Sequence, residues 1–93
     1  GVKMSNCLYL VQSSYHATPH MMQYINQVYQ HGDCVVLMGD AVLHADLYCQ
    51  DYRCAILDAD AGMLLSVPSQ IQVLSYADFA DLTLSYSRCM RLQ

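Results

Sequence analysis

Five cysteines are the residues of this chain best suited to chemistry, because a thiolate can act as a nucleophile. They are Cys7, Cys34, Cys49, Cys54 and Cys89. Cys34 and Cys54 stand in apolar runs and Cys7 opens another, so we expect all three to pack in the core. Cys49, in YCQDYRC, is predicted to be the best exposed thiol, and the nearby Arg53 would favour its thiolate. Cys49 is therefore the candidate functional cysteine.

The spacing of cysteines and histidines indicates neither a redox pair nor a metal site. Cys49 and Cys54 do not form a C-x-x-C pair, which argues against thioredoxin-like chemistry. His16 and His20 are four residues apart, a spacing that can present two ligands on one helix face. However, Thr18 is predicted to cap a helix that begins at Pro19, which separates the two histidines. We expect surface histidines and no bound metal.

No other motif points to a cofactor or to a hydrolase. The segment MGDAV, residues 38–42, follows an apolar run, at the end of a strand where α/β proteins place ligands. It lacks the G-x-G-x-x-G pattern of a phosphate-binding loop. Ser13 and Ser14 form no nucleophile elbow. The eight tyrosines have few basic neighbours, so we interpret them as packing and interface residues.

The composition predicts one small domain that associates with other chains. The chain has 93 residues, of which 55% are hydrophobic and 13% are charged. We expect a single domain at residues 4–93 and interpret residues 1–3, before the first methionine, as an expression remnant. With so few charged residues, part of the surface of the domain is expected to lie against a partner, in an oligomer or a hetero-complex.

The charge distribution argues against direct binding of nucleic acid. The net charge is −4, and the four basic residues are Lys3, Arg53, Arg88 and Arg91. Phosphate recognition needs more lysine and arginine than this, so tRNA would be contacted only through a partner. No apolar run is long enough to span a bilayer, and no secretory segment is evident. We expect a cytoplasmic protein with reduced cysteines and no membrane contact.

Apolar runs and breaks alternate along the chain in the manner of an α/β protein. Strands are predicted at residues 7–12, 34–38, 54–58 and 71–75. One helix is predicted from Pro19 to about His31, with Gly32 just beyond its end. Further helices are predicted at 41–48 and after Ser75, and a short helical turn at 59–65. The continuous apolar run at 34–38 indicates a central strand buried on both faces. We therefore predict a small layered α/β fold with a mostly parallel sheet of four to five strands flanked by helices.

The last predicted helix has a clear start and an apolar stripe. Ser75 and Asp78 have the spacing of a capping box. The stripe comprises Phe79, Leu82 and Tyr86. Arg88 and Arg91 are expected at or beyond the C-terminal end of the helix. These features predict a helix docked on the sheet, and Asp78 is better interpreted as a cap than as a general acid or base.

Three segments resemble the TusB/DsrH family of sulfur-relay proteins. LSYADFADLTLSYSRCM, residues 74–90, is similar to the C-terminal segment of that family. The matching positions there are Tyr76, Asp78, Phe79, Leu82, Thr83 and Met90, and Ser75 starts the helix. HGDCVVLMGDAVLHA, residues 31–45 with Asp40, and RCAILDADAGMLL, residues 53–65, are similar to two further segments. The resemblance covers nearly all of residues 4–90.

The resemblance implies a DsrE/DsrF/DsrH-like fold and a place in a complex of three kinds of subunit, assembled as a dimer of heterotrimers. The implied partners are paralogous DsrE/TusD-like and DsrF/TusC-like subunits, and the isolated chain is expected to form homo-oligomers. In the branch associated with tRNA, such a complex relays persulfide sulfur towards 2-thiolation of the wobble uridine. In the other branch it serves intracellular sulfur oxidation. Some relatives carry a cysteine in the first helix, at a position near Ile25 of this chain.

Three functional hypotheses follow from these observations. The first is a non-catalytic subunit of a sulfur-relay complex, which acts in tRNA thiolation or, alternatively, in sulfur oxidation. The second is an independent persulfide carrier with sulfur on Cys49 or Cys89. The third is a homo-oligomeric α/β protein with an unrelated binding role.

Overall fold

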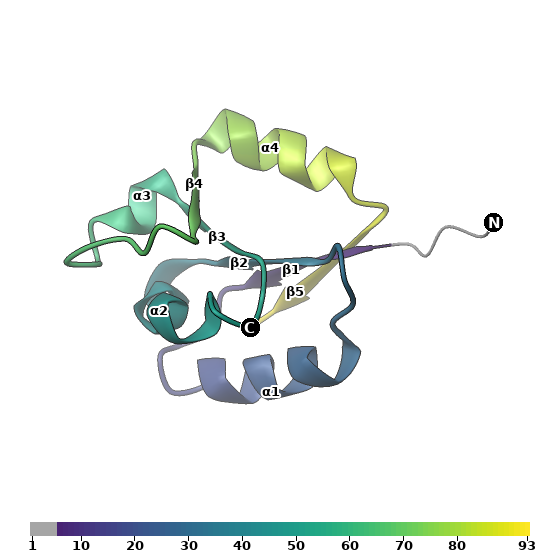
Figure 1. Ribbon diagram of the computed structural model, residues 1–93, viewed down its shortest axis with the longest axis horizontal. Coiled ribbons are helices and arrows are strands. Elements are labelled where there is room, and N and C mark those ends of the chain that lie inside the picture. The colour runs from purple at the N-terminus through teal and green to yellow at the C-terminus, as the bar shows by residue number, and fades with distance from the viewer. Residues whose placement is uncertain (1–5) are drawn as a thin grey trace.

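The computed structural model describes residues 6–93 as a layered α/β domain, and the expected remnant at residues 1–3 lies outside the described residues. Along the chain the elements are β1 (Cys7–Val11), α1 (Thr18–Val28), β2 (Cys34–Leu37), the 3-10 helix η1 (Gly39–His44), α2 (Ala45–Tyr48), β3 (Cys54–Leu57), α3 (Asp58–Ala61), β4 (Gln72–Leu74), α4 (Tyr76–Ser85) and β5 (Arg88–Leu92). Figure 1 shows the sheet between α1 on one side and α4 on the other. The predicted fold class is confirmed.

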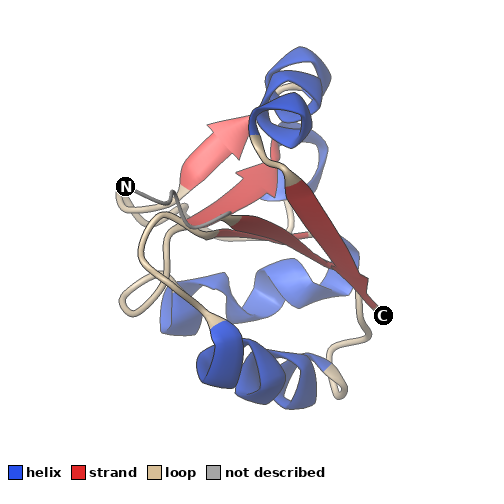
Figure 2. Cartoon of the chain, turned by 90° about the vertical axis from the view of Figure 1, so that its right-hand side faces the viewer, coloured by secondary structure: helices blue, strands red, loops and turns tan. Residues whose placement is uncertain are grey.

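The five strands form one parallel sheet in the order β4-β3-β2-β1-β5. All four residues of β2 are buried, as its unbroken apolar sequence predicts for a central strand. The chain passes from β1 to β4 in one direction across the sheet and then returns to β5. Because crossovers between parallel strands are right-handed, connections in opposite directions lie on opposite faces. This is why α4, the return connection, lies on the opposite side of the sheet from α1 and α2 (Figure 2).

The sheet separates two clusters of buried side chains. The first lies under α1, η1 and α2; its largest fully buried members include Tyr9, Met22, Ile25 and Leu37. The second lies under α4; its buried members are Leu8, Leu10, Cys34, Val36, Ala55, Leu57 and Leu74. The predicted stripe of α4 packs on this second cluster through Phe79, Leu82 and Tyr86. The prediction that this helix docks on the sheet is therefore confirmed.

The start of α1 differs from the prediction. The N-cap is Ala17, and Thr18 is already the first helical residue, so Thr18 is not the cap. Its side chain is fully buried, and its hydroxyl donates to the Ser14 carbonyl at 2.7 Å and contacts the Ser13 hydroxyl at 2.8 Å. A hydroxyl that satisfies buried groups of the preceding loop cannot also turn towards the helix amides.

The end of α1 also differs from the prediction. The helix ends at Val28, so His31 and Gly32 lie in the following turn and do not end the helix. The Asp33 amide donates to the Gln30 carbonyl at 2.9 Å, which closes this turn. Gly32 has φ of +95°, and an added Cβ would lie 2.8 Å from Nδ2 of Asn6. Glycine is thus needed here for a tight turn and for close packing.

The residues after α4 form a strand, where the sequence pattern was interpreted as a helix end. The helix stops at Ser85, and β5 pairs in parallel with the whole of β1. Arg88 and Arg91 therefore lie in an edge strand. The intervening Tyr86 donates its hydroxyl hydrogen to the Gly32 carbonyl at 3.0 Å, which fixes the point where the helix ends. The strand alternates Met90 and Leu92, which pack on the first cluster, with exposed residues.

The remaining predicted elements are close to the observed ones. The helix predicted at 41–48 is present as η1 followed by α2, and the turn predicted at 59–65 is present earlier, as α3. The strands predicted at 54–58 and 71–75 correspond to β3 and β4. No helix within residues 6–93 is both long and apolar enough to cross a membrane.

Candidate functional site

The candidate thiol Cys49 is buried, which contradicts the expectation that it is exposed. Only 8% of Cys49 is accessible, and its thiol donates to the Asp46 carbonyl at 3.5 Å. The residue follows the last turn of the short helix α2, and the first cluster includes its side chain. Arg53 points elsewhere, because its guanidinium donates to the Tyr86 hydroxyl at 3.4 Å. Neither the exposure nor the cationic neighbour that favoured Cys49 is present.

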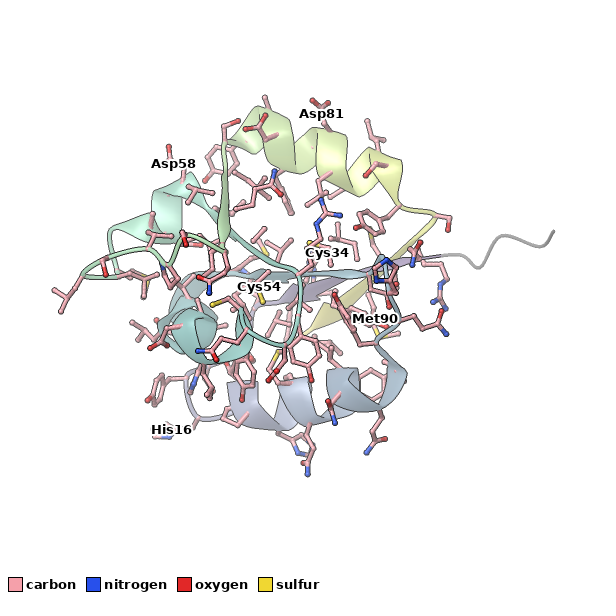
Figure 3. All side chains as sticks on the ribbon, in the orientation of Figure 1. His16, Cys34, Cys54, Asp58, Asp81 and Met90 are labelled. Atoms are coloured by element: carbon pink, nitrogen blue, oxygen red, sulfur yellow. The ribbon has the colours of Figure 1, made fainter. Side chains whose placement is uncertain are left out.

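Three further cysteines are core residues, as predicted. Cys7, Cys34 and Cys54 are all buried, and Figure 3 shows Cys34 and Cys54 near the middle of the sheet. Burial raises the pKa of Cys54 to about 12 and also raises the pKa of the Cys7 and Cys34 thiols. The charge of Arg53 opposes the increase at Cys34 without reversing it. Thiols protonated at neutral pH and shielded from solvent are poor nucleophiles.

Cys89 is the exposed cysteine, and its position follows from β5. It lies opposite Leu8 of β1, between Arg88 and Arg91. Side chains alternate along a strand, so Cys89 and Arg91 share the face covered by α4. The sequence pattern did not predict these neighbours of Cys89, because it places the segment at the end of a helix. The alternation of Met90 and Leu92 with polar or exposed residues is a weak signal of a strand, and it is short enough to be overlooked.

Asp33 is a buried carboxylate that the sequence did not identify. It accepts hydrogen bonds from the backbone N–H groups of Cys7 at 2.8 Å and Gln30 at 2.9 Å, and from Nδ2 of Asn6 at 3.0 Å. Burial alone would raise the pKa of Asp33, but the three hydrogen bonds and the charge of Arg88 bring it below its ordinary value. Two donors come from Asn6 and Cys7 at the start of β1 and the third from Gln30 in the loop, so the role of Asp33 is to hold the loop before β2 against β1.

Acidic residues follow the carboxyl ends of β2 and β3. Asp40, which lies in one of the segments that carry the resemblance, is exposed in η1. Asp60 of α3 accepts a hydrogen bond from the Gly39 amide at 3.1 Å and so ties α3 to the start of η1. Asp60 is thus the aspartate that makes a hydrogen bond between these elements, whereas Asp40 is exposed to solvent.

A small pocket lies between the carboxyl ends of β3 and β4. Its volume is about 220 Å³, and its lining residues are Leu57, Asp58, Ala59, Leu74, Ser75 and Tyr76. The floor is apolar, Asp58 contributes a carboxylate, and Tyr76 is 73% exposed. Asp58 has no second carboxylate beside it in this lining, and the Ser75 hydroxyl is engaged by the Asp78 amide, so the arrangement suits contact with a partner side chain more than acid–base chemistry.

The residues of α4 on which the resemblance rests have structural roles. The Asp78 amide donates to the Ser75 hydroxyl at 3.1 Å and the Ser75 amide to the Asp78 carboxylate at 3.4 Å, which confirms the predicted capping box. The Thr83 hydroxyl donates back to the Ala80 carbonyl at 2.7 Å. Asp78 is therefore engaged at the helix start. Together with the packing of Phe79 and Leu82, these contacts define how the helix is placed.

The two histidines lie at the surface, as predicted. His16 precedes α1 and His20 lies in its first turn; both are exposed, and His16 projects from the periphery in Figure 3. They border an open groove of about 630 Å³ together with Tyr48 and Tyr52. Within residues 6–93 no group of three or more His, Cys, Asp or Glu side chains is arranged to hold a metal ion.

Comparisons with known proteins add no family to this description. A scan against protein-family models found no match, and a search among curated proteins found none. The resemblance to TusB/DsrH proteins accordingly rests on the three sequence segments given above and stays a prediction.

Proposed function

We propose that this chain is a non-catalytic subunit of a heteromeric sulfur-relay complex that acts in 2-thiolation of the tRNA wobble uridine. The observation that carries the non-catalytic role is the burial of four of the five cysteines. The sulfur-relay assignment is supported by the resemblance of residues 31–45, 53–65 and 74–90 to TusB/DsrH proteins. The partners are paralogous DsrE/TusD-like and DsrF/TusC-like subunits, and one of them supplies the sulfur-carrying cysteine.

The position near Ile25, where some relatives carry a cysteine, supports the same role. Ile25 is fully buried in α1 and belongs to the first cluster. A residue that fills the core is unable to receive sulfur from another protein. The work of this chain is therefore to complete the assembly and to shape the surface around a partner's cysteine.

Exposed apolar side chains support association with partners. On a domain of this size they include Leu47, Leu65, Tyr76 and Leu84, each more than half exposed. Apolar side chains left in solvent are common at protein interfaces. Unpaired cysteines are usual in the cytoplasm, which is where we place the complex.

The test is complementation in a bacterial strain that thiolates tRNA through such a relay and lacks the corresponding subunit. We expect this chain to co-purify with the DsrE/TusD-like and DsrF/TusC-like subunits and to restore 2-thiouridine, measured by mass spectrometry of digested tRNA. We also expect Cys89→Ser and Cys49→Ser to restore it equally. A chain that remains apart from both subunits, and restores no thiolation, would contradict the proposal.

A second candidate function is a persulfide carrier, which the exposure of Cys89, on the same face of β5 as Arg91, favours. In that reaction the Cys89 thiolate would attack the terminal sulfur of a persulfide on a cysteine desulfurase. The donor S–S bond breaks, a new S–S bond forms at Cys89, and the donor leaves as a thiolate, with no net oxidation. A mass increase of one sulfur after incubation, absent in Cys89→Ser and kept in Cys49→Ser, would establish this function and exclude the non-catalytic role.

A further inference from the structure

The outer edge of β4 is open and lies beside a groove. β4 pairs with β3 on one side, and within residues 6–93 no strand pairs with its other side. Between this edge and α4 is a groove of about 350 Å³. Its lining residues are Gln72, Leu74, Asp78, Asp81, Leu82 and Ser85. An exposed strand edge offers unpaired N–H and C=O groups to another extended chain.

The side chains of β4 define what such a chain would meet. Gln72 and Leu74 line the groove and therefore face α4, whereas Val73 points to the opposite side of the sheet and is 40% exposed. A strand added at this edge would place alternate side chains in the groove beside α4 and the others beside Val73. The side chains in the groove would meet the carboxylates of Asp78 and Asp81, and those on the other side would meet the apolar Val73.

The charged residues that line this groove, Asp78 and Asp81, are both acidic. Arg53, the nearby basic residue, contacts Tyr86 beyond the end of α4. Residues 54–87 contain four aspartates, at 58, 60, 78 and 81, and no lysine, arginine or histidine, so this segment alone carries a charge of −4. The whole chain has eight acidic and four basic residues and the same net charge of −4, so the remaining residues are balanced. Figure 3 shows Asp58 and Asp81 on the side of the molecule that α3 and α4 occupy.

The opposite edge of the sheet is different. β5 presents Arg88 and Arg91, which are both exposed. Charged side chains on an edge strand are a common means of preventing unwanted pairing. β4 has no charged residue of its own, and the nearest charges in its groove are Asp78 and Asp81. The β4 edge is therefore open to strand addition, selectively for basic sequences.

We propose that the β4 edge binds an extended, basic segment of a partner protein by strand addition. Lysine or arginine side chains at alternate positions of that segment enter the groove and meet Asp78 and Asp81. Apolar side chains at the other positions cover Val73. Backbone hydrogen bonds to β4 supply affinity, and the carboxylates supply selectivity. This binding mode is independent of the sulfur-relay proposal.

A second copy of this chain is the alternative occupant, because β5 is itself an extended basic segment. Such a contact would join the β5 edge of one copy to the β4 edge of the next. The contact is heterologous, and in a flat continuation of the sheet it would repeat into an open array. A partner protein is therefore the occupant that we favour, and self-association becomes an outcome of the test.

The probe is a fluorescent capped peptide, Val-Lys-Val-Arg-Val, measured by anisotropy against the full chain. Two controls keep its length: Val-Glu-Val-Glu-Val reverses the charge, and Val-Lys-Pro-Arg-Val keeps the charge but cannot pair as a continuous strand. We expect binding of the first peptide and at least about tenfold weaker binding of both controls. Amide exchange of the bound chain should be slowed at residues 72–74.

Two matched charge reversals locate the site. Asp81→Lys, in the groove, should weaken binding of the basic peptide about tenfold, whereas Asp46→Lys, an exposed aspartate of α2, should change it less than about twofold. Equal binding of the proline peptide, equal effects of the two reversals, or no binding of the alternating peptide would each overturn the proposal. Concentration-dependent self-association that protects the amides of residues 72–74 and is abolished by Asp81→Lys would overturn it in favour of a second copy.

Discussion

The two longest helices cover opposite faces of the same sheet, but α1 is built into the core and α4 is not. α1 buries Thr18, Met22 and Ile25 completely or nearly so. α4 has no fully buried residue and rests on the sheet through partly buried side chains. The capping box and the Tyr86 hydrogen bond hold α4 at its two ends. Stability is thus concentrated on the α1 face, which leaves the α4 side free to serve as a binding surface.

The largest effect should come from removing a core side chain of α1. Ile25→Ala should lower the free energy of unfolding by about 3 kcal/mol, because it leaves a cavity among fully buried residues. Leu82→Ala, in the half-buried stripe of α4, should cost about 1 kcal/mol. Urea denaturation monitored by circular dichroism measures both. Equal losses would show that the two faces contribute equally and that the contrast drawn above is wrong.

The next effect concerns the buried carboxylate that holds the loop between α1 and β2. Asp33→Asn keeps the shape but weakens two or three hydrogen bonds, and we expect a loss of about 2 kcal/mol at pH 7. Because folding lowers the pKa of Asp33, the ionised carboxylate stabilises the native state above its unfolded pKa of about 4. That stabilisation disappears as the pH falls through the lower, folded pKa.

The corresponding measurement is the unfolding free energy between pH 7 and pH 2. The native chain should lose stability on acidification more steeply than Asp33→Asn. Asp51→Asn, at an exposed turn position, is the matched control and should follow the native curve. If the native chain and Asp33→Asn lose stability equally on acidification, the ionised Asp33 carboxylate does not stabilise the native state.

A smaller effect is expected at the start of α4. Ser75→Ala removes the hydroxyl that accepts from the Asp78 amide, which should cost about 1 kcal/mol. Ser87→Ala, at an exposed serine just after the helix, should have no measurable effect. Amide exchange should accelerate in the first turn of α4 in Ser75→Ala while residues of α1 keep their protection. Faster exchange in both helices would mean that α4 is coupled to the core more tightly than its burial indicates.

The smallest effect on stability is expected at the exposed face of α4. Leu84 is 85% accessible, so Leu84→Ser should change the unfolding free energy by less than about 0.5 kcal/mol. If α4 contacts the proposed sulfur-relay partners, the same change should reduce co-purification with them. Gln23→Ser, at an exposed position of α1, is the comparison. Unchanged recovery of the partners by Leu84→Ser would direct attention to a different surface.

Local sequence patterns predicted the parts of the fold that depend on local interactions. The apolar run of β2 and the capping box of Ser75 and Asp78 were both confirmed, because each is encoded within a few residues. β5 was missed because Arg88–Leu92 has a weak pattern and becomes a strand through pairing with β1, far away in the chain. The exposure of Cys49 was misjudged for a related reason. A short polar segment around it does not reveal that the first cluster lies beneath.

The candidate site was less predictable than the fold. The histidines were correctly assigned to the surface and three cysteines to the core. The burial of Asp33 has no sequence signature, since two of its three donors, at Asn6 and Cys7, are distant in the sequence and only the folded chain brings them close. Likewise, the open edge of β4 follows from the order of the strands, which the residues of β4 alone do not specify.

The pairing of the last strand with the first has a consequence for folding during synthesis. β1 begins at Cys7 and its partner β5 begins at Arg88, so 81 positions (88 − 7) separate the paired residues. Closing so long a loop is slow, and it occurs only after residues 88–92 leave the ribosome. Until then β1, with the apolar Leu8 and Tyr9, lacks a neighbour on one side. We expect the nascent chain to depend on chaperones during this interval, and premature termination before residue 88 to leave an aggregation-prone strand.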